Sequence, residues 1–348
     1  MKIALITGSC GLVGSESVEF FIRKKFKVIG IDNDLRKFFF GKTASTTWVK
    51  SYLEKKYNKN YKHFNSDITK IDEVEKIFKK YKKKISLIIH CAAQPSHDYG
   101  KNFPIIDFDV NAKGTLNLLE LTKRYCYDAK FIFMSTNKVY GDNPNRIELK
   151  EKNSRWEVSN KSQYFNGIKE DFSIDHCTHS FFGASKTYAD LIVQEYGKNV
   201  GLNTVCFRGG CITGPNHSGA KLHGFLSYLV KLSLKEKKYS IIGYKGKQVR
   251  DNLHSNDLVN CFWQYYKKPR KGEVYNIGGG RNSNCSINEA LDLVEKIKNI
   301  SIKREYLKNP RVGDHIWYIS NLDKFKKHYP KWNQKYDTKK IIDELILS

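Results

Sequence analysis

KIALITGSCGLVGS, residues 2–15, decides the fold of this chain. Its apolar first half reads as a buried strand, and Gly8, Gly11 and Gly14 then form a GxxGxxG pattern that opens a helix. The first glycines allow a tight turn and a close approach of the backbone to a pyrophosphate, and the last lets helix and strand pack closely. The helix N-terminus faces the phosphates with its partial positive charge. The stretch therefore predicts a dinucleotide-binding strand–loop–helix unit.

Beyond this stretch, short apolar runs alternate with amphipathic segments. The alternation predicts an α/β protein with a Rossmann-type, doubly wound parallel sheet that is covered by helices on both faces. The region from residue 222 onward is less regular, and we expect a smaller α/β substrate-binding domain there. The expected sheet domain covers about residues 1–190 with pieces near 200–215 and 250–265, and the smaller domain covers about 216–249 and 266–348. The expected strands are 2–7, 27–32, 86–93, 130–135 and 204–208, and the expected helices are 13–24, 72–81, 112–125 and 185–198.

An acidic residue identifies the dinucleotide. Asp32 ends the second expected strand, 18 residues after Gly14. A carboxylate at this place can hydrogen-bond the adenosine ribose hydroxyls and repels the extra phosphate of NADP, so NAD is the expected cofactor. Arg36 lies nearby and weakens the preference for NAD over NADP. The cofactor contacts expected in this part of the chain are Gly8, Gly11, Leu12, Val13, Gly14, Asp32 and Asn33.

Composition excludes several other classes of protein. The 348 residues carry a net charge of +25, but the excess is mostly lysine spread along the chain, without an Arg-rich arm or zinc finger. We therefore expect no nucleic-acid partner. No apolar run approaches the ~18 residues of a membrane helix, so we expect no membrane association. The eight cysteines form no CxxC pair, which indicates reduced thiols in a cytoplasmic protein and no metal site.

Several later segments resemble one enzyme family across nearly the whole chain. These segments are Asp67-Ile68, Cys91-Ala92-Ala93, Asn111, STNKVYG at 135–141 and GASK at 183–186. Together with GxxGxxG, they resemble the extended short-chain dehydrogenase/reductase (NAD-dependent epimerase/dehydratase) family. The resemblance implies that Asp67 and Ile68 contact the adenine and that Ala92 and Ala93 lie along the nicotinamide half of NAD. It also implies that Lys186 holds the nicotinamide ribose and acts in catalysis with Thr136.

Three short sequence motifs make the resemblance more specific. AAQPSHD at 92–98, STNK at 135–138 and GKQVRD at 246–251 are similar to the CDP-tyvelose (CDP-paratose) 2-epimerases and their relatives. Dehydratases of the family usually carry an Asp-Glu pair just after the threonine, where this chain has Asn137 and Lys138. The acid and base for water elimination are therefore missing. The resemblance implies an NAD-dependent epimerase of a nucleotide-diphosphate sugar, acting at C2 through a transient keto sugar.

The same resemblance suggests substrate contacts. Arg250 and Arg311 resemble arginines that grip the diphosphate in sugar-nucleotide epimerases, and the planar guanidinium suits phosphate oxygens. Asp314 can accept hydrogen bonds from ribose hydroxyls. A homodimer through helices 112–125 and 185–198 is also implied. The other expected substrate contacts are Gln94, Ser96, Asn137, Arg208 and His223.

One departure concerns the catalytic residue. The family uses Tyr-x-x-x-Lys, but Phe182 stands four residues before Lys186, and phenylalanine cannot transfer a proton. Another group can serve as base, water can act with Thr136 and Lys186, or the protein binds without turnover. Phe182 also motivates a non-catalytic NAD and sugar-nucleotide binder as an alternative. The enzymatic alternatives to C2 epimerisation are 4-epimerisation and dehydrogenation with decarboxylation, and the shape of the sugar pocket decides between them. The candidate bases are His179, His97, Tyr99, Tyr140 and Lys138.

Overall fold

The structure is a computed structural model that describes residues 2–216, 224–311 and 313–347. The chain divides into two compact units. Unit 1 consists of residues 1–139, 181–208 and 259–275, and unit 2 of residues 140–180, 209–258 and 276–348. This division differs from the expected one mainly because residues 140–180 belong to unit 2.

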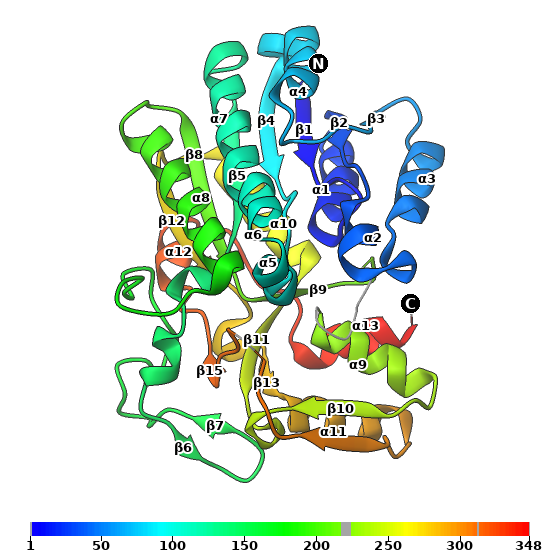
Figure 1. Cartoon of the computed structure of the whole chain (residues 1–348), viewed down its shortest axis with the longest axis vertical. Coiled ribbons are helices and arrows are strands. Elements are labelled where there is room, and N and C mark those ends of the chain that lie inside the picture. Colours follow the sequence, from blue (N-terminus) through cyan, green and yellow to red (C-terminus); the bar gives the residue numbers. More distant parts are fainter. Residues whose placement is uncertain (1, 217–223, 312, 348) are drawn as a thin grey trace. The chain divides into compact units, whose positions relative to one another are not determined.

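A seven-stranded sheet forms the core of unit 1, in the order β12-β8-β5-β4-β1-β2-β3 (Figure 1). Strands β3, β2, β1, β4 and β5 pair in parallel, and Ala4 of β1 lies opposite Val28 on one side and Leu87 on the other. Every residue of β1 is buried, as a parallel strand covered on both faces requires. The order confirms the Rossmann-type sheet. The strands are β1 (Ile3–Thr7), β2 (Lys27–Ile31), β3 (Tyr61–Phe64), β4 (Ile85–His90), β5 (Lys130–Thr136), β8 (Asn203–Gly209) and β12 (Glu273–Ile277).

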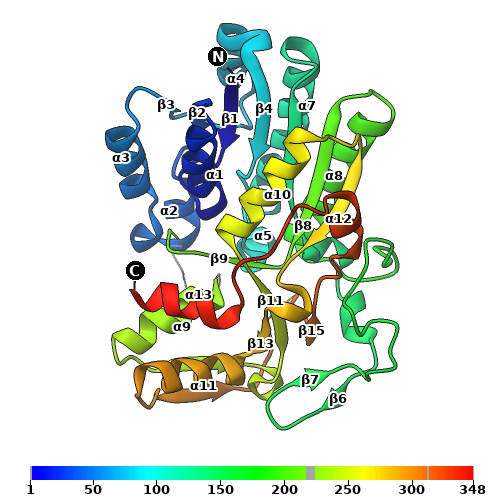
Figure 2. The ribbon, with the colours of Figure 1, turned by 180° about the vertical axis from the view of Figure 1, so that it is seen from behind.

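Helices cover both faces of this sheet (Figures 1 and 2). On one face, apolar side chains of α4, α7 and α8 join a single core cluster with Leu5 and Phe131 of the sheet. On the other face lie α1 and α10, where the Trp263 ring contacts Phe20 and Phe21. The helices are α1 (Leu12–Arg23), α2 (Leu35–Phe40), α3 (Thr47–Lys56), α4 (Ile71–Tyr81), α5 (His97–Asn102), α6 (Pro104–Phe108), α7 (Gly114–Tyr125), α8 (Ser180–Lys198) and α10 (Ser255–Lys267).

The expected strands and helices of the sheet are present, and two helices begin at other residues than expected. A π-helical turn, Asp109–Lys113, precedes α7. Helix α8 begins at Ser180 rather than Ser185. Phe182 and Gly183 are both buried within it, so tertiary packing overrides the low helix propensity of glycine.

Unit 2 has its own core. Strand β11 is central: it pairs in parallel with β9 and β15 and antiparallel with β13. Helices α9, α11 and α13 share a separate apolar cluster. The strands are β6 (Lys150–Glu151), β7 (Trp156–Glu157), β9 (Cys211–Thr213), β10 (Tyr239–Ile242), β11 (Val249–His254), β13 (Asn284–Ser286), β14 (Arg304–Leu307) and β15 (Trp317–Tyr318). The helices are α9 (Phe225–Leu234), α11 (Ile287–Lys298), α12 (Asp323–His328) and α13 (Thr338–Leu347).

The eight cysteines are free thiols. Within residues 2–216, 224–311 and 313–347, no three His, Cys, Asp or Glu side chains gather as they would around a metal ion. In the same ranges, no helix has the length and apolar character needed to cross a membrane.

Candidate active site

The glycine loop joins β1 to α1 in a shape that leaves no room for a Cβ atom at Gly8 or Gly14. Gly8 has φ +65°, and a Cβ on it would lie 2.7 Å from the backbone nitrogen of Ala92. A Cβ on Gly14 would lie 2.0 Å from the Gly8 carbonyl oxygen. The helix cap residue, Gly11, provides no side-chain hydrogen bond to the first turn of α1, which begins with Leu12 and Val13. The first-turn N–H groups therefore keep the orientation that binds a phosphate.

Asp32 follows β2 and is tied to the same loop. Its Oδ2 accepts a hydrogen bond from the Cys10 N–H at 3.0 Å, and its Oδ1 accepts one from the Asp34 N–H at 2.9 Å. Burial raises the pKa of the Asp32 carboxyl, while these N–H groups oppose the rise. The next residue, Asn33, is exposed and accepts a hydrogen bond from the Leu35 N–H at 3.3 Å. The narrow glycine cradle and the adjacent carboxylate fit the pyrophosphate and adenosine ribose of NAD.

The segment after β3 contains the expected adenine contacts. Asp67 accepts hydrogen bonds from the backbone N–H and the side-chain hydroxyl of Thr69, at 2.9 and 2.8 Å. Ile68 is buried, and the Asn117 amide donates to its carbonyl at 3.0 Å. Asp67 thus shapes a turn that places Ile68 against Gly114 of α7. The adenine contact itself stays a prediction.

The end of β4 lies beside the glycine loop. The Cys91 N–H donates to the Thr7 carbonyl at 3.2 Å, and the Ala92 N–H donates to the Thr7 hydroxyl at 3.3 Å. Ala92 and Ala93 are half-buried, so the small side chains expected along the nicotinamide follow directly from the strand that adjoins β1.

A buried polar network links this segment to α8. The Gln94 amide donates to Asp107 at 2.5 Å, and the Ser185 hydroxyl donates to the other oxygen of Asp107. Asn111 accepts from the Gln94 N–H at 2.9 Å and donates to Ser185 at 3.1 Å. Ser96 caps α5 by accepting from a backbone N–H at 3.1 Å. Gln94 and Ser96, predicted as substrate contacts, are therefore buried and held by protein groups.

Asp107 is a residue of this network that the sequence did not predict. Its carboxylate is 1% exposed, and burial raises its pKa against the hydrogen bonds from Ser185 and Gln94. An aspartate in an amphipathic stretch reads as a surface residue, and only the tertiary contacts reveal its position. Its two partners lie on the loop after β4 and immediately before Lys186, so Asp107 fixes both segments relative to each other.

Lys186 of α8 contacts β5 near its end, where Thr136 is the last residue. Lys186 is 3% exposed, and its Nζ donates to the Met134 carbonyl at 2.9 Å, two residues before Thr136. The Nζ also lies 4.1 Å from the centre of the Phe133 ring. Burial lowers the pKa of Lys186 to about 8. Asn137 is 7% exposed, and its side chain accepts from the Thr136 hydroxyl at 3.4 Å.

Phe182 occupies the expected place, one helical turn before Lys186. The ring is 7% exposed and is contacted edge-to-face by His97, with 5.0 Å between the ring centres. His179 belongs to unit 2, where its Nε2 lies 2.8 Å from the Ile174 carbonyl and 3.4 Å from the Cys177 sulfur. The structure therefore places His97 in contact with the ring that replaces the family's tyrosine.

Arg208 forms buried contacts within unit 1. It lies on β8, is 5% exposed and forms two hydrogen bonds with Asp190 of α8, at 2.8 and 3.2 Å. Ser135 also donates to Asp190. These contacts give Arg208 a structural part that sequence reasoning did not anticipate, because nothing in the sequence pairs Arg208 with Asp190.

Unit 2 brings together the predicted diphosphate ligands. The Arg250 guanidinium forms an ion pair with Asp314 and donates to the Val249 carbonyl at 2.8 Å. Arg311 lies in the same turn as Asp314, whose N–H donates to the Arg311 carbonyl at 3.2 Å. Within the part of the chain that the structure describes, the buried Nε of Arg311 has no hydrogen-bond partner. Two arginines and one aspartate leave a net positive charge that suits an anion. His223 lies outside the described residues.

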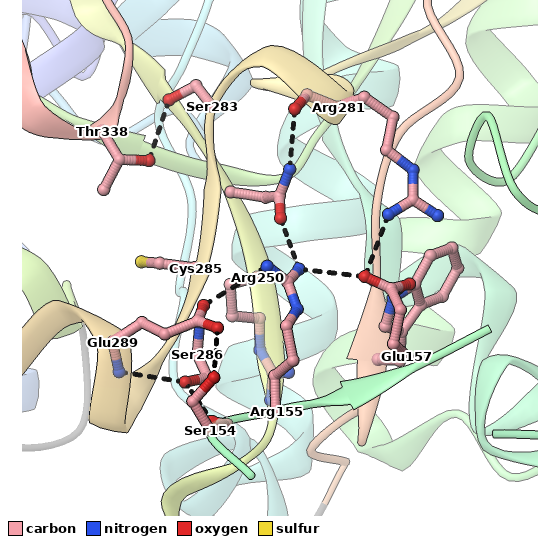
Figure 3. A network of polar contacts seen from close by, with 12 residues as sticks. Ser154, Arg155, Glu157, Arg250, Arg281, Ser283, Cys285, Ser286, Glu289 and Thr338 are labelled. Carbon is pink, nitrogen blue, oxygen red and sulfur yellow. Dashed lines mark hydrogen bonds and ion pairs between the residues drawn. The ribbon is translucent and has the colours of Figure 1, made fainter. Parts of the chain in front are cut away.

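A second polar network supports β11 in unit 2 (Figure 3). Glu157 is 6% exposed. Its carboxylate forms ion pairs with Arg155 at 3.3 Å and Arg281 at 3.0 Å, and it accepts a hydrogen bond from the Trp317 indole N–H at 3.0 Å. Arg155 also pairs with Glu289 at 3.3 Å. The network joins the β6–β7 hairpin to the β13–α11 segment around the buried Glu157, so we assign it to structure.

Comparisons with known proteins agree with this geometry. CDP-paratose 2-epimerase of Salmonella typhi is 30% identical over 99% of this chain and 98% of its own length. UDP-glucuronate 4-epimerase of Thermodesulfobacterium geofontis is 29% identical over 88% of this chain and 84% of its own length. Among solved structures, a Tyr-to-Phe mutant of UDP-glucuronic acid 4-epimerase from Bacillus cereus, in complex with UDP-4-deoxy-4-fluoro-glucuronic acid and NAD, matches with a TM-score of 0.79. That match covers 99% of this chain and 98% of the other at 24% identity.

The sequence model of the NAD dependent epimerase/dehydratase family matches residues 4–278. This range contains the glycine loop, Asp32, Thr136 and Lys186. The match and the full-length relative confirm both the expected family and the expected cofactor, NAD. This chain belongs to the NAD-dependent epimerase/dehydratase family.

Proposed function

We propose that this protein epimerises a nucleotide-diphosphate sugar at C2 through a transient keto sugar. Unit 1 would bind NAD, and Arg250 and Arg311 of unit 2 would bind the diphosphate. The observation that carries the proposal is the segment at the end of β5. Thr136 lies there and the buried Lys186 of α8 hydrogen-bonds the same strand, but Asn137 and Lys138 replace the carboxyl groups that elimination of water requires. The full-length similarity to a CDP-paratose 2-epimerase supports the choice of C2.

Bound NAD would supply a hydride acceptor that is regenerated in each cycle. With a pKa near 8, Lys186 remains protonated in most molecules at pH 7, so it can donate hydrogen bonds to the nicotinamide ribose. The Thr136 hydroxyl can hydrogen-bond the reacting sugar oxygen as its charge develops. The buried network of Asp107, Gln94 and Ser185 holds the two segments rigid around these groups.

A second candidate function is binding of NAD and sugar nucleotide without turnover. Phe182 favours it, because the ring cannot accept a proton. The similarity to a UDP-glucuronate 4-epimerase leaves C4 as the other reaction centre.

NMR of CDP-, UDP- and GDP-hexoses incubated with the purified protein, without added cofactor, tests these alternatives. The proposal predicts a new C2 epimer, and a C4 epimer would instead identify the rival reaction. Bound NAD with no conversion of any sugar, and no absorbance change from NAD reduction, would support the non-catalytic binder. Lys186→Met should abolish conversion. Lys198→Met, which removes an exposed lysine of the same helix, is the matched control.

We also propose that the protein forms a homodimer through α7 and α8. Tyr188 and Leu191 of α8 are 38% and 44% exposed, and Phe108, just before the π-helical turn that leads into α7, is 50% exposed. Exposed apolar side chains on neighbouring helices are typical of subunit interfaces. Light scattering on the purified protein measures the mass, and substitution of Leu191 by glutamate should yield monomers.

A further inference from the structure

The proposed reaction needs a proton acceptor, and the candidate groups differ in what their side chains contact. Tyr140 is fully buried in unit 2, and its hydroxyl donates to Asn276 at 2.8 Å. The His179 Nε2 lies against the Ile174 carbonyl. Tyr99 packs its ring on Phe39 and Phe103, and burial raises its pKa, which makes the phenol a poorer base at neutral pH.

His97 differs from these groups by its position. Its ring contacts Phe182 with 5.0 Å between ring centres and 75° between ring planes. Phe182 in turn lies one helical turn before Lys186, so the imidazole lies beside the position that the Tyr-x-x-x-Lys pattern assigns to the acid–base group. His97 is also half-buried, whereas Phe182 is 7% exposed. The imidazole therefore keeps more of its surface accessible than the Phe182 side chain does.

The backbone that carries His97 is held firmly. Ser96 caps the helix that begins at His97, and its N–H donates to the Gln94 side chain. Gln94 is joined through Asp107 to Ser185, the residue before Lys186. One continuous buried network therefore positions His97 and Lys186 together, which is the preorganisation that proton transfer at a fixed sugar carbon needs.

We propose that His97 is the catalytic base that replaces the missing tyrosine. This inference rests on the proposed function. The sugar hydroxyl gives its proton to a neutral imidazole nitrogen, directly or through one water, while its carbon gives a hydride to NAD. The sugar is oxidised to a ketone and NAD is reduced. In the second half, the ketone recovers the hydride on its opposite face and the proton from the imidazolium, so atoms and electrons balance.

The test compares wild-type protein with His97→Gln, His97→Gln/Phe182→Tyr and the control His176→Gln, which replaces an exposed histidine. Turnover is measured by NMR on the sugar nucleotide that the wild type converts. Thermal unfolding and NAD content establish that each variant is folded and loaded. We expect His97→Gln to lose at least about 100-fold in kcat, within the range of general-base effects. His176→Gln should match the wild type.

Two readouts separate catalysis from a structural role. The wild-type kcat/KM should fall as the pH drops, because protonation removes the base, and His97→Gln should lose this dependence. The phenol in His97→Gln/Phe182→Tyr restores the family's pattern, so it should recover much of the lost turnover and change the pH profile. A purely structural His97 would give neither result.

The outcomes are distinct. Conversion by His97→Gln within about threefold of the wild type, with an unchanged pH profile, would overturn the role of His97 and leave the proposed function standing. Failure of the NAD-loaded wild type to convert any nucleotide sugar would overturn the proposed function, and the role of His97 with it.

Discussion

Asp251 of β11, beside the predicted diphosphate ligand Arg250, should make the protein less stable as the pH rises through the acidic range. The carboxyl is 1% exposed. Its Oδ2 accepts hydrogen bonds from the N–H groups of Ser320 at 2.9 Å and Gly280 at 3.2 Å. Its Oδ1 is buried without a hydrogen-bond partner in residues 2–216, 224–311 and 313–347. Burial raises the pKa of Asp251 from 3.8 to about 6.

The direction of this pH dependence follows from proton binding. Between pH 4 and pH 6 the folded protein keeps a proton on Asp251 that the unfolded chain has released, so raising the pH favours unfolding. A pKa shift of this size corresponds to a destabilisation of the folded state by about 3 kcal/mol. This destabilisation is absent below the pKa of the unfolded chain and is complete above pH 6. Asp251→Asn removes the titration but keeps an oxygen for the two N–H groups.

Urea unfolding between pH 4 and pH 7.5, followed by tryptophan fluorescence, measures this effect, because Trp317 and Trp332 are buried in unit 2. The stability of the wild type relative to Asp251→Asn should fall by most of ~3 kcal/mol over this range, whatever constant offset the amide introduces. Asp171→Asn, at an exposed aspartate, controls for the loss of one charge. A difference between wild type and Asp251→Asn that stays constant with pH would refute the reasoning.

Three further predictions concern unit 1. Gly14→Ala should unfold at a much lower temperature than Gly11→Ala, because the new Cβ would meet backbone at 2.0 Å instead of 3.4 Å; thermal unfolding of both compares them. Asp190→Ala should lower the free energy of unfolding, measured in urea, by ~3–5 kcal/mol, because it leaves the buried Arg208 without its ion-pair partner. Replacing both residues by apolar ones should recover most of this loss. Because burial lowers the pKa of Lys186 to about 8, cofactor-free protein should gain up to about 3 kcal/mol between pH 8 and pH 10.5, as the unfolded chain alone stays protonated. Lys186→Met should show no such increase in stability with pH. An equal increase in this variant would show that other groups cause it.

Much of unit 1 could be predicted from the sequence, because its signals are local. A strand buried on both faces is a continuous apolar run, and a helix packed on one face repeats its apolar residues every three or four positions. The glycine loop and Asp32 are likewise read from spacing along one strand–loop–helix unit. The start of α8 was predicted five residues late, because glycine at 183 reads as a helix breaker unless its burial is known.

The sequence alone determined the family, the cofactor, and the replacement of the acid–base tyrosine by Phe182, because each depends on residue identity at a fixed spacing. Tertiary structure decided which groups surround that replacement. His97 and Phe182 are 85 positions apart, and Asp107 meets Ser185 across 78. Such contacts arise only when the loop after β4 and the start of α8 pack together, and no local pattern records which side chains then meet. The same holds for Arg208, whose partner Asp190 comes from a different element.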